Sequence, residues 1–169
     1  AVPIRDRSYA FSHCLNETVI DGFVNLDDFD IVIWILGDES TADETFSSTE
    51  QTLVSNYLKA GGKLLVSGSE IGWDLGRSGV SSPSDISFYN NYLKSTYVAD
   101  APLGASNTYY NVETIGGGLF NGLSDFSFDN GSHGTFNVSW PDAILKNGGS
   151  VNILKYKNVD ISNGGAGIV

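Results

Sequence analysis

The pattern of apolar and polar residues in the first half of the chain predicts a strand, a helix and a second strand. Residues 31–36 read Ile-Val-Ile-Trp-Ile-Leu without a polar break, which is typical of a strand buried on both faces. Residues 63–67 form a second apolar strand that Gly68 ends. Between them, Ser47 and Glu50 form a capping box that opens an amphipathic helix. This order predicts a right-handed βαβ unit with two parallel strands.

Further elements are predicted on either side of this unit. A short strand over 8–12 and a short helix capped by Asn16 precede it. A helix opens at Pro83, because proline at the first helical position follows Ser82, a capping residue. Beyond residue 97, short strand-like segments alternate with Gly and Asn turns: 108–115, 124–129, 135–139 and 151–156. The pattern predicts an α/β fold with an open, mostly parallel sheet flanked by helices, and a β-rich C-terminal half.

Length and charge narrow the class of protein. The 169 residues suit a single domain spanning 1–169. There are 20 acidic and 9 basic residues, and the net charge of -11 disfavours nucleic acid, whose phosphates need a basic face. No stretch approaches the roughly 20 apolar residues of a membrane helix.

Composition favours an extracellular setting. Charged residues make up only 17% of the chain, so Ser, Thr, Asn and Gly must supply much of its surface, as expected for a secreted or cell-surface protein. The single cysteine, Cys14, excludes an internal disulfide. The chain holds no methionine, and we expect it to be a fragment of a longer chain.

Candidate chemistry gathers where the two central strands end. Ligands of open parallel sheets bind beyond the carboxyl ends of the strands. The segment 68–72 reads Gly-Ser-Glu-Ile-Gly, the pattern of a nucleophile elbow, a strained turn whose middle side chain is lifted out. Here the middle residue is Glu70, and Ser69 precedes it. We expect a binding crevice formed by Gly37, Asp38, Glu39, Gly68, Gly72, Trp73 and Asp74.

These segments resemble a known family of domains. Residues 34–41 and 66–75 carry the resemblance, and 88–93 and 126–131 fit the same pattern. They resemble a domain of secreted, multi-modular bacterial proteins that are often labelled xanthan-lyase-like or N-acetylmuramoyl-alanine-amidase-like. That domain is similar to class I glutamine amidotransferases. The resemblance spans about 9–169 and implies a flavodoxin-like fold.

The resemblance also bears on chemistry. It places the cysteine nucleophile of amidotransferases at Glu70, and their oxyanion loop at Gly37 and Asp38. The family's downstream His, followed two places on by Glu, is absent, because His133 is followed by Gly134 and then a threonine. Glutamine hydrolysis needs a thiolate paired with an imidazole, so these departures argue against glutaminase activity.

The resemblance further implies a strand before residue 9 and a continuation beyond residue 169. The first strand of a flavodoxin-like sheet is central, and a sheet without it would leave strand edges unpaired. We expect Ala1–Arg7 to hold a partial version of this strand, or another chain to supply it.

Three functions remain open. The favoured hypothesis is a non-catalytic or degenerate amidotransferase-like accessory module that binds a glycan or a protein partner. The second is a hydrolase acting on glycans or peptidoglycan, with Glu70 as acid or base and Asp38 or Glu39 as its partner; a pairing of Ser69 with His133 is its weaker variant. The third is a subunit of an extracellular fibre or layer, in which a neighbouring copy completes the sheet.

Simpler structural roles compete with each candidate. Glu70 can cap the helix that follows it. Trp73 can be the floor of a sugar site or can simply pack, and His133 can be a surface residue. No cofactor is expected apart from Ca²⁺, whose oxygen ligands could come from an acidic loop that can equally be solvated. The acids of this loop are Asp38, Glu39, Asp43 and Glu44.

Overall fold

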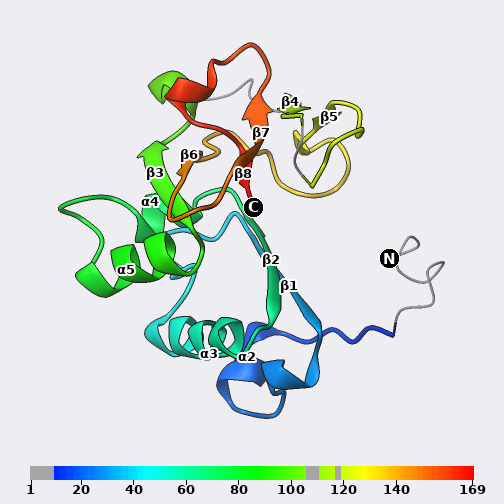
Figure 1. The fold of residues 1–169 in the computed structure, drawn as a ribbon, viewed down its shortest axis with the longest axis vertical. Helices are drawn as coiled ribbons and strands as arrows, with labels where there is room; N and C mark the ends of the chain where they lie inside the picture. The colour runs from blue at the N-terminus through cyan, green and yellow to red at the C-terminus, as the bar shows by residue number, and fades with distance from the viewer. Residues whose placement is uncertain (1–9, 106–110, 117–118) are drawn as a thin grey trace.

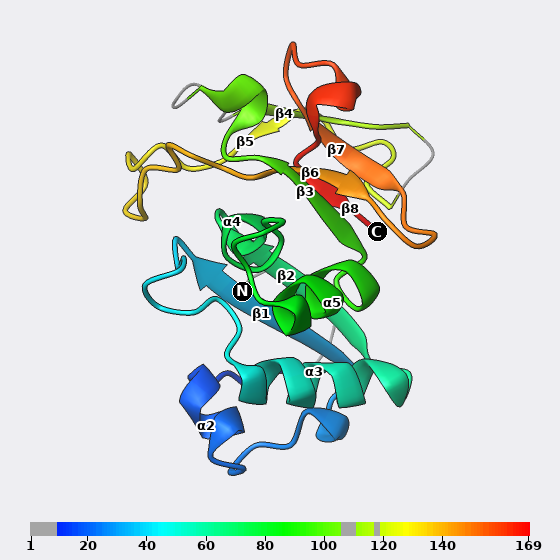
Figure 2. The same cartoon turned by 90° about the vertical axis from the view of Figure 1, so that its left-hand side faces the viewer.

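The structure, a computed structural model, describes residues 10–105, 111–116 and 119–169. It has two parts, one above the other in Figure 1. The lower part holds a pair of long strands with helices beside them, and the upper part holds short strands. Two further helices lie between these parts (Figure 2). None of the helices in the described ranges has the length and hydropathy needed to cross a membrane.

The lower part is the predicted βαβ unit. Strands β1 (Ile31–Gly37) and β2 (Lys63–Gly68) are parallel neighbours, with Ile33 opposite Leu65. Helix α3 (Ser48–Lys59) connects them. The prediction of a strand, a helix and a parallel strand is therefore confirmed for this segment.

Helix α3 begins at the predicted capping box. The Ser47 N–H donates to Glu50 Oε2 at 2.8 Å, and Ser47 Oγ accepts from the Glu50 N–H at 3.4 Å. The other Glu50 oxygen accepts from Asn16 Nδ2 at 2.9 Å. Asn16 is the first residue of helix α2 (Asn16–Ile20), and Leu15, not Asn16, is at the cap position. The Asn16 side chain therefore links α2 to α3 and does not cap its own helix.

The core of the lower part lies between the strand pair and the helices. Trp34 and Leu36 of β1 pack with Val54 and Tyr57 of α3, and all four side chains are almost fully buried. The ring of Phe46 stacks on Trp34 with the centroids 5.5 Å apart. One face of β1 and β2 is thus covered.

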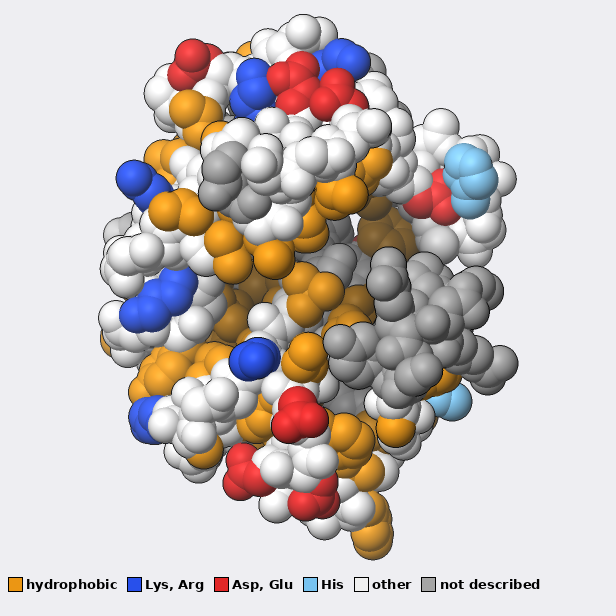
Figure 3. Space-filling model, turned by 45° about the vertical axis from the view of Figure 1, so that its right-hand side comes forward, with side chains coloured by type: hydrophobic (Ala, Val, Ile, Leu, Met, Phe, Trp, Pro, Cys, Tyr) orange, Lys and Arg blue, Asp and Glu red, His pale blue; other side chains and the backbone are white. Residues whose placement is uncertain are grey.

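The opposite face of the strand pair is open. Ile31, Ile33 and Ile35 are 57%, 50% and 67% exposed, and Leu65 of β2 is 50% exposed. These four side chains are called the open face below. Figure 3, which brings the right-hand side of Figure 1 forward, shows hydrophobic side chains gathered across its middle. The prediction that residues 31–36 are buried on both faces is wrong for the described residues, because α3 and its neighbours all pack on the other face.

Two helices follow β2. These are α4 (Ile71–Leu75) and α5 (Pro83–Asn91). The Ser82 N–H donates to Asp85 Oδ2 at 3.1 Å, and Ser82 Oγ accepts from the Asp85 N–H at 3.2 Å. The predicted helix start at Pro83 is therefore confirmed. Tyr89 of α5 is almost fully buried and joins the core of the lower part.

The upper part consists of short antiparallel strands. Strand β3 (Ser95–Ala99) pairs with β6 (Ala143–Lys146). The second sheet comprises β4 (Asn111–Thr114), β5 (Phe126–Ser127), β7 (Asn152–Tyr156) and β8 (Gly167–Ile168). The 3-10 turns η2 (Pro102–Gly104) and η3 (Ile161–Asn163) follow β3 in the chain, and η1 (Leu26–Asp28) precedes β1 in the lower part. The strand order in the second sheet is β5-β4-β7-β8, and Val112 and Tyr156 are buried beneath it.

The expected fold class is wrong. The pattern and the resemblance predict a flavodoxin-like, mostly parallel sheet, but β1–β2 is the one parallel pair among the described strands and the other pairs are antiparallel. Parallel neighbours need a crossover of a dozen or more residues, usually a helix. After β3 the described residues contain short strands, 3-10 turns and loops but no α-helix, so they hold no helical crossover to a further parallel strand. Strand β3 itself pairs with β6, antiparallel.

The predicted N-terminal strand is not present in the described residues. Of the segment 8–12, residues 10–12 are not in a strand, and residues 8 and 9 lie outside the described ranges. The segment Ala1–Arg7, expected to hold a partial first strand, also lies outside them.

The strand predictions for the second half are partly correct. Segment 135–139 forms only an isolated bridge at Asn137. The sequence pattern missed β3 and β6. The segments 108–115, 124–129 and 151–156 contain β4, β5 and β7.

Substitutions on the two faces of β1 are expected to lower the free energy of unfolding by different amounts. Trp34→Ala removes a buried ring and should lower the free energy of unfolding by about 3–5 kcal/mol. Ile33→Thr keeps a β-branched side chain at an exposed position, so we expect a change within about 1 kcal/mol. Urea unfolding of both variants measures the difference. Equal losses would contradict the assignment of a covered and an open face.

Candidate functional site

The structure brings the two predicted loops together at the carboxyl ends of β1 and β2. Gly37 lies opposite Gly68. The Gly37 carbonyl accepts the Ser69 N–H at 3.0 Å and the Ser69 hydroxyl at 3.3 Å. The Ser69 Oγ thus donates to the main chain and does not face a base.

Glu70 does not adopt the strained conformation of a nucleophile elbow. It is the residue before α4, with φ -127° and ψ 29°, outside the left-handed region that stores strain. Its side chain makes no capping hydrogen bond to the helix. Gly72, the second glycine of the pattern, serves close packing: a Cβ there would lie 2.6 Å from the Tyr89 hydroxyl and 2.9 Å from a ring carbon of Tyr97.

Asp142 occupies the helix N-terminus that Glu70 could have capped. Its carboxylate accepts the Gly72 N–H at 2.5 Å and the Trp73 N–H at 3.1 Å. The start of α4 offers these N–H groups to an anion, as helix N-termini do. In this chain a carboxyl group from the segment just before β6 takes this position.

Asp142 makes contacts through three groups: its carboxylate, its N–H and its carbonyl. We call this set of contacts the Asp142 junction. Its own N–H donates to the Ser69 carbonyl at 2.8 Å, and its carbonyl accepts the Tyr156 hydroxyl at 2.7 Å. Burial raises the pKa of the Asp142 carboxyl well above its ordinary value, although the bonds from Gly72 and Trp73 act in the opposite direction. Sequence reasoning missed Asp142, which no motif or period marks.

The charge of Glu70 acts on Asp100 and Asp142, which were not among its predicted partners. This charge raises the pKa of Asp100 and of Asp142, after burial, which is the larger cause for both. One oxygen of Asp100 is buried without a hydrogen-bond partner in the described structure. The pKa of Glu39 is raised by burial and then by Glu50, and Glu70 is not among its causes. The structure therefore does not bring Glu70 together with Glu39 as a catalytic pair.

Asp74 and Trp73 are occupied by neighbouring groups. Asp74 Oδ2 accepts the Thr45 N–H at 2.9 Å and the Thr45 hydroxyl at 2.7 Å, so it holds the loop between β1 and α3. The Arg77 guanidinium lies 3.7 Å above the centre of the Trp73 ring, and its Nε donates to the Trp73 carbonyl. One face of this ring is thus closed to a sugar.

His133 lies in a separate loop of the upper part. Its Nδ1 is 3.1 Å from the Ser132 hydroxyl and 3.4 Å from Asp129 Oδ1, and its side chain is 83% exposed. No hydrogen bond or ion pair of the described residues joins it to Ser69 or Glu70. Asp129 has its pKa lowered to about 2, mainly by the Thr135 hydroxyl.

The acidic loop does not form a compact group of ligands. Asp38, Asp43 and Glu44 are exposed, and Glu39 is half-buried. Among the residues that the structure describes, no three His, Cys, Asp or Glu side chains converge as a metal site would require. Calcium binding there remains a prediction.

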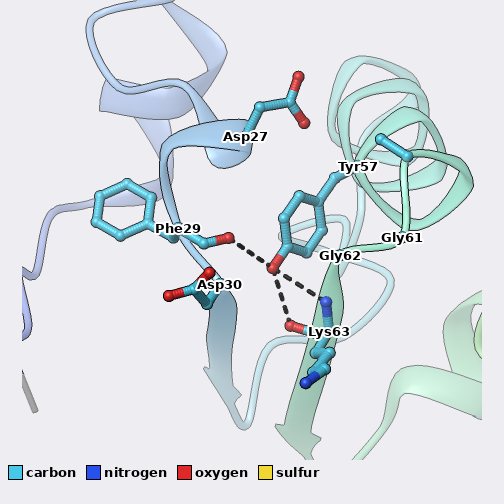
Figure 4. A pocket seen from close by; sticks show the side chains of 8 residues that line it. Asp27, Phe29, Asp30, Tyr57, Gly61, Gly62 and Lys63 are labelled. Carbon is cyan, nitrogen blue, oxygen red and sulfur yellow. Dashed lines mark hydrogen bonds between the residues drawn. The ribbon is translucent and has the colours of Figure 1, made fainter.

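A pocket lies at the other end of the strand pair, where β1 and β2 begin. Its volume is about 290 Å³. Figure 4 shows Asp27 and Asp30 at its edge and the Tyr57 ring at its centre. The Tyr57 hydroxyl is already bonded, because it lies 3.1 Å from the Phe29 carbonyl, the Lys63 carbonyl and the Lys63 N–H. The pocket therefore offers carboxylates and a ring, and no free hydroxyl.

Comparison of the chain with protein-family models, with curated proteins and with solved structures gives no match. The interpretation of the site therefore depends on the geometry described above.

Removing the Asp142 carboxyl should loosen the junction. Asp142→Ala leaves the Gly72 and Trp73 N–H groups without an acceptor, and we expect the free energy of unfolding to fall by about 2–3 kcal/mol at about pH 4. Asp142→Asn keeps one acceptor oxygen and should lose less. Urea unfolding compares the two variants. Equal stability of the Ala and Asn variants would contradict the proposed role of these hydrogen bonds.

The raised pKa of Asp142 predicts a pH dependence of stability. A carboxyl with a raised pKa in the folded state binds its proton more tightly there than in the unfolded chain. The contribution of Asp142 to the free energy of unfolding is therefore greatest below about pH 4, near the ordinary Asp pKa. This contribution is lost as the pH rises through the raised pKa. Because Asn does not titrate, Asp142→Asn should gain stability relative to the unaltered chain as the pH rises above about 4. Asp125→Asn, at an exposed ion pair with Lys157, should show no such gain.

Proposed function

We propose that this chain is a non-catalytic protein-interaction module whose β1–β2 strand pair is completed by a segment of another polypeptide. The observation that carries the proposal is the open face. The sequence of residues 31–36 is that of a strand buried on both sides, yet three isoleucines of this run are half or more exposed.

Covering the open face would be favourable. Ile31, Ile33, Ile35 and Leu65 form a continuous apolar surface, because Ile31 and Ile33 lie opposite Lys63 and Leu65 in the register. Burying one such half-exposed side chain is worth about 1 kcal/mol, so the four together contribute about 4 kcal/mol to binding. Contiguous apolar surface of this kind is typical of interaction sites.

The edges of the strand pair favour an added strand. Within the described ranges, β1 and β2 pair only with each other, so the outer edge of each strand has main-chain groups available for hydrogen bonding. An extended peptide can pair with such an edge, and its alternate side chains can then lie over the neighbouring face.

The loop after β2 supports a non-catalytic role. The N–H groups of Gly72 and Trp73, which could stabilise an anionic intermediate, are bonded to Asp142. Ser69 donates to a main-chain carbonyl, and Glu70 has neither the strained geometry nor a facing base. A hydrolase would need these groups free.

A protein partner suits the open face better than a glycan. Isoleucine and leucine side chains offer no donor or acceptor, so sugar hydroxyls placed on them would lose their hydrogen bonds to water. A secreted or cell-surface setting, favoured by the composition, is part of the same proposal.

Site-specific photocrosslinking tests this function. Benzoylphenylalanine at position 33, in the full chain made in its own cells, should yield a crosslink that maps to one segment of a partner protein. The same group at position 80 should not, because Val80 is comparably exposed, at 65%, but lies outside the open face. The mapped segment, added as a peptide, should slow hydrogen exchange of the β1 amides. Adducts that are equal at both positions, or peptides that leave β1 exchange unchanged, would contradict the proposal.

A further inference from the structure

The open face has acidic residues at both of its ends. Asp27, Asp28 and Asp30 lie just before β1 and are exposed. The acidic loop Asp38–Glu44 follows β1, and three of its four acids are exposed. Figure 3 shows acidic side chains gathered at the lower end of the hydrophobic surface. The open face of β1 is therefore apolar, and acidic residues precede and follow this strand in the chain.

Within the described ranges, no ion pair neutralises these acids. The ion pairs found among the described residues involve Asp129, Glu113 and Asp125, all in the upper part. Lys63, which lies opposite Ile31 in the register, forms no ion pair with Asp27 or Asp30. The acids at the ends of β1 can therefore pair with positive charges from outside.

We propose that the segment bound by the open face carries alternating apolar side chains in its middle and lysine or arginine at both ends. This inference rests on the proposed function and adds the chemistry of the partner. The alternation follows from the open face, where exposed residues recur at every second position of β1. The basic ends follow from charge complementarity with the acids before and after β1.

The length of β1 sets the spacing of the charges. At about 3.3 Å per residue, a seven-residue strand separates its two ends by roughly 20 Å. A bound segment of similar length would therefore place its terminal basic residues beside the two acidic groups while its apolar residues cover Ile33 and its neighbours.

The pocket at the start of β1 can receive one of these basic side chains. It is lined by two carboxylates, Asp27 and Asp30, and by the ring of Tyr57 (Figure 4). A guanidinium or ammonium group pairs with carboxylates and is attracted to the faces of aromatic rings. Lys63 of this pocket lies opposite Ile31 in the register, so the pocket is at the start of the strand pair, with Tyr57 reaching it from the covered face.

The same charges disfavour a second copy as the occupant. The chain has a net charge of -11, and pairing two open faces would bring the acidic ends of both copies together. Like charges opposed across an interface reduce affinity, so a basic-ended segment of a different protein fits better.

Binding of two synthetic peptides to the intact chain tests the inference. Each peptide alternates valine and threonine in the middle; one carries two lysines at each end and the other two glutamates. At about 50 mM salt the lysine peptide should bind at least tenfold more tightly, and about 0.5 M NaCl should reduce this preference severalfold by screening. Fluorescence anisotropy of labelled peptides gives both affinities.

Matched variants show which residues bind the lysine peptide. Ile33→Thr with Ile35→Thr should weaken the lysine peptide at least fivefold. Asp27→Asn with Asp30→Asn should weaken it about threefold or more. The same charge change in Asp125→Asn with Asp160→Asn, in the upper part, should leave its affinity unchanged.

The outcomes separate this inference from the proposed function. Equal, Ile33-dependent binding of both peptides would overturn the basic-ended partner and leave the interaction module standing. Dimerisation in sedimentation experiments that Ile33→Thr abolishes would do the same, by making a second copy the occupant. Absence of binding by either peptide would overturn the inference, and the crosslinking experiment would then decide the function independently.

Discussion

The arrangement of the molecule depends on the junction made by Asp142. A single residue donates its main-chain N–H to the loop after β2, accepts the first N–H groups of α4, and accepts the Tyr156 hydroxyl through its carbonyl. A buried carboxyl without such partners would cost several kcal/mol. Its partners come from both the lower and the upper part, so Asp142 links them, beside the buried hydrogen bond between Ser95 and Tyr89.

This junction also decides what the strand ends can do. A helix N-terminus after a parallel strand is a natural anion site, and the sequence has a suitable loop for one between Gly68 and Gly72. The Asp142 carboxylate takes that place and leaves Glu70 beside other acids. The functional surface of the molecule is then better sought on the open side of β1 and β2, where the apolar residues are exposed and, among the described residues, the acids before and after β1 form no ion pair.

The starts of α3 and α5 could be predicted from the sequence because their causes are local. The capping boxes at Ser47 and Ser82 act over three residues, and both form as the sequence indicates. The parallel strand pair was also predictable, since a helix of α3's length between two apolar strands leaves few other arrangements. The pairing of β3 with β6 was not, because β3 follows a helix as a parallel strand would, and only its distant partner shows otherwise.

For the candidate site, the sequence established which loops meet but not what fills them. The meeting of Gly37 with Ser69 follows from the parallel register. The arrival of Asp142 depends on a contact across 70 residues, which no spacing rule reports. The sequence by itself thus determined the local elements, the acidic charge and the two-sided apolar character of β1, because these follow from neighbouring side chains. The tertiary structure alone decided that one side of β1 is open and that the helix N-terminus is occupied, because both depend on where distant segments come to lie.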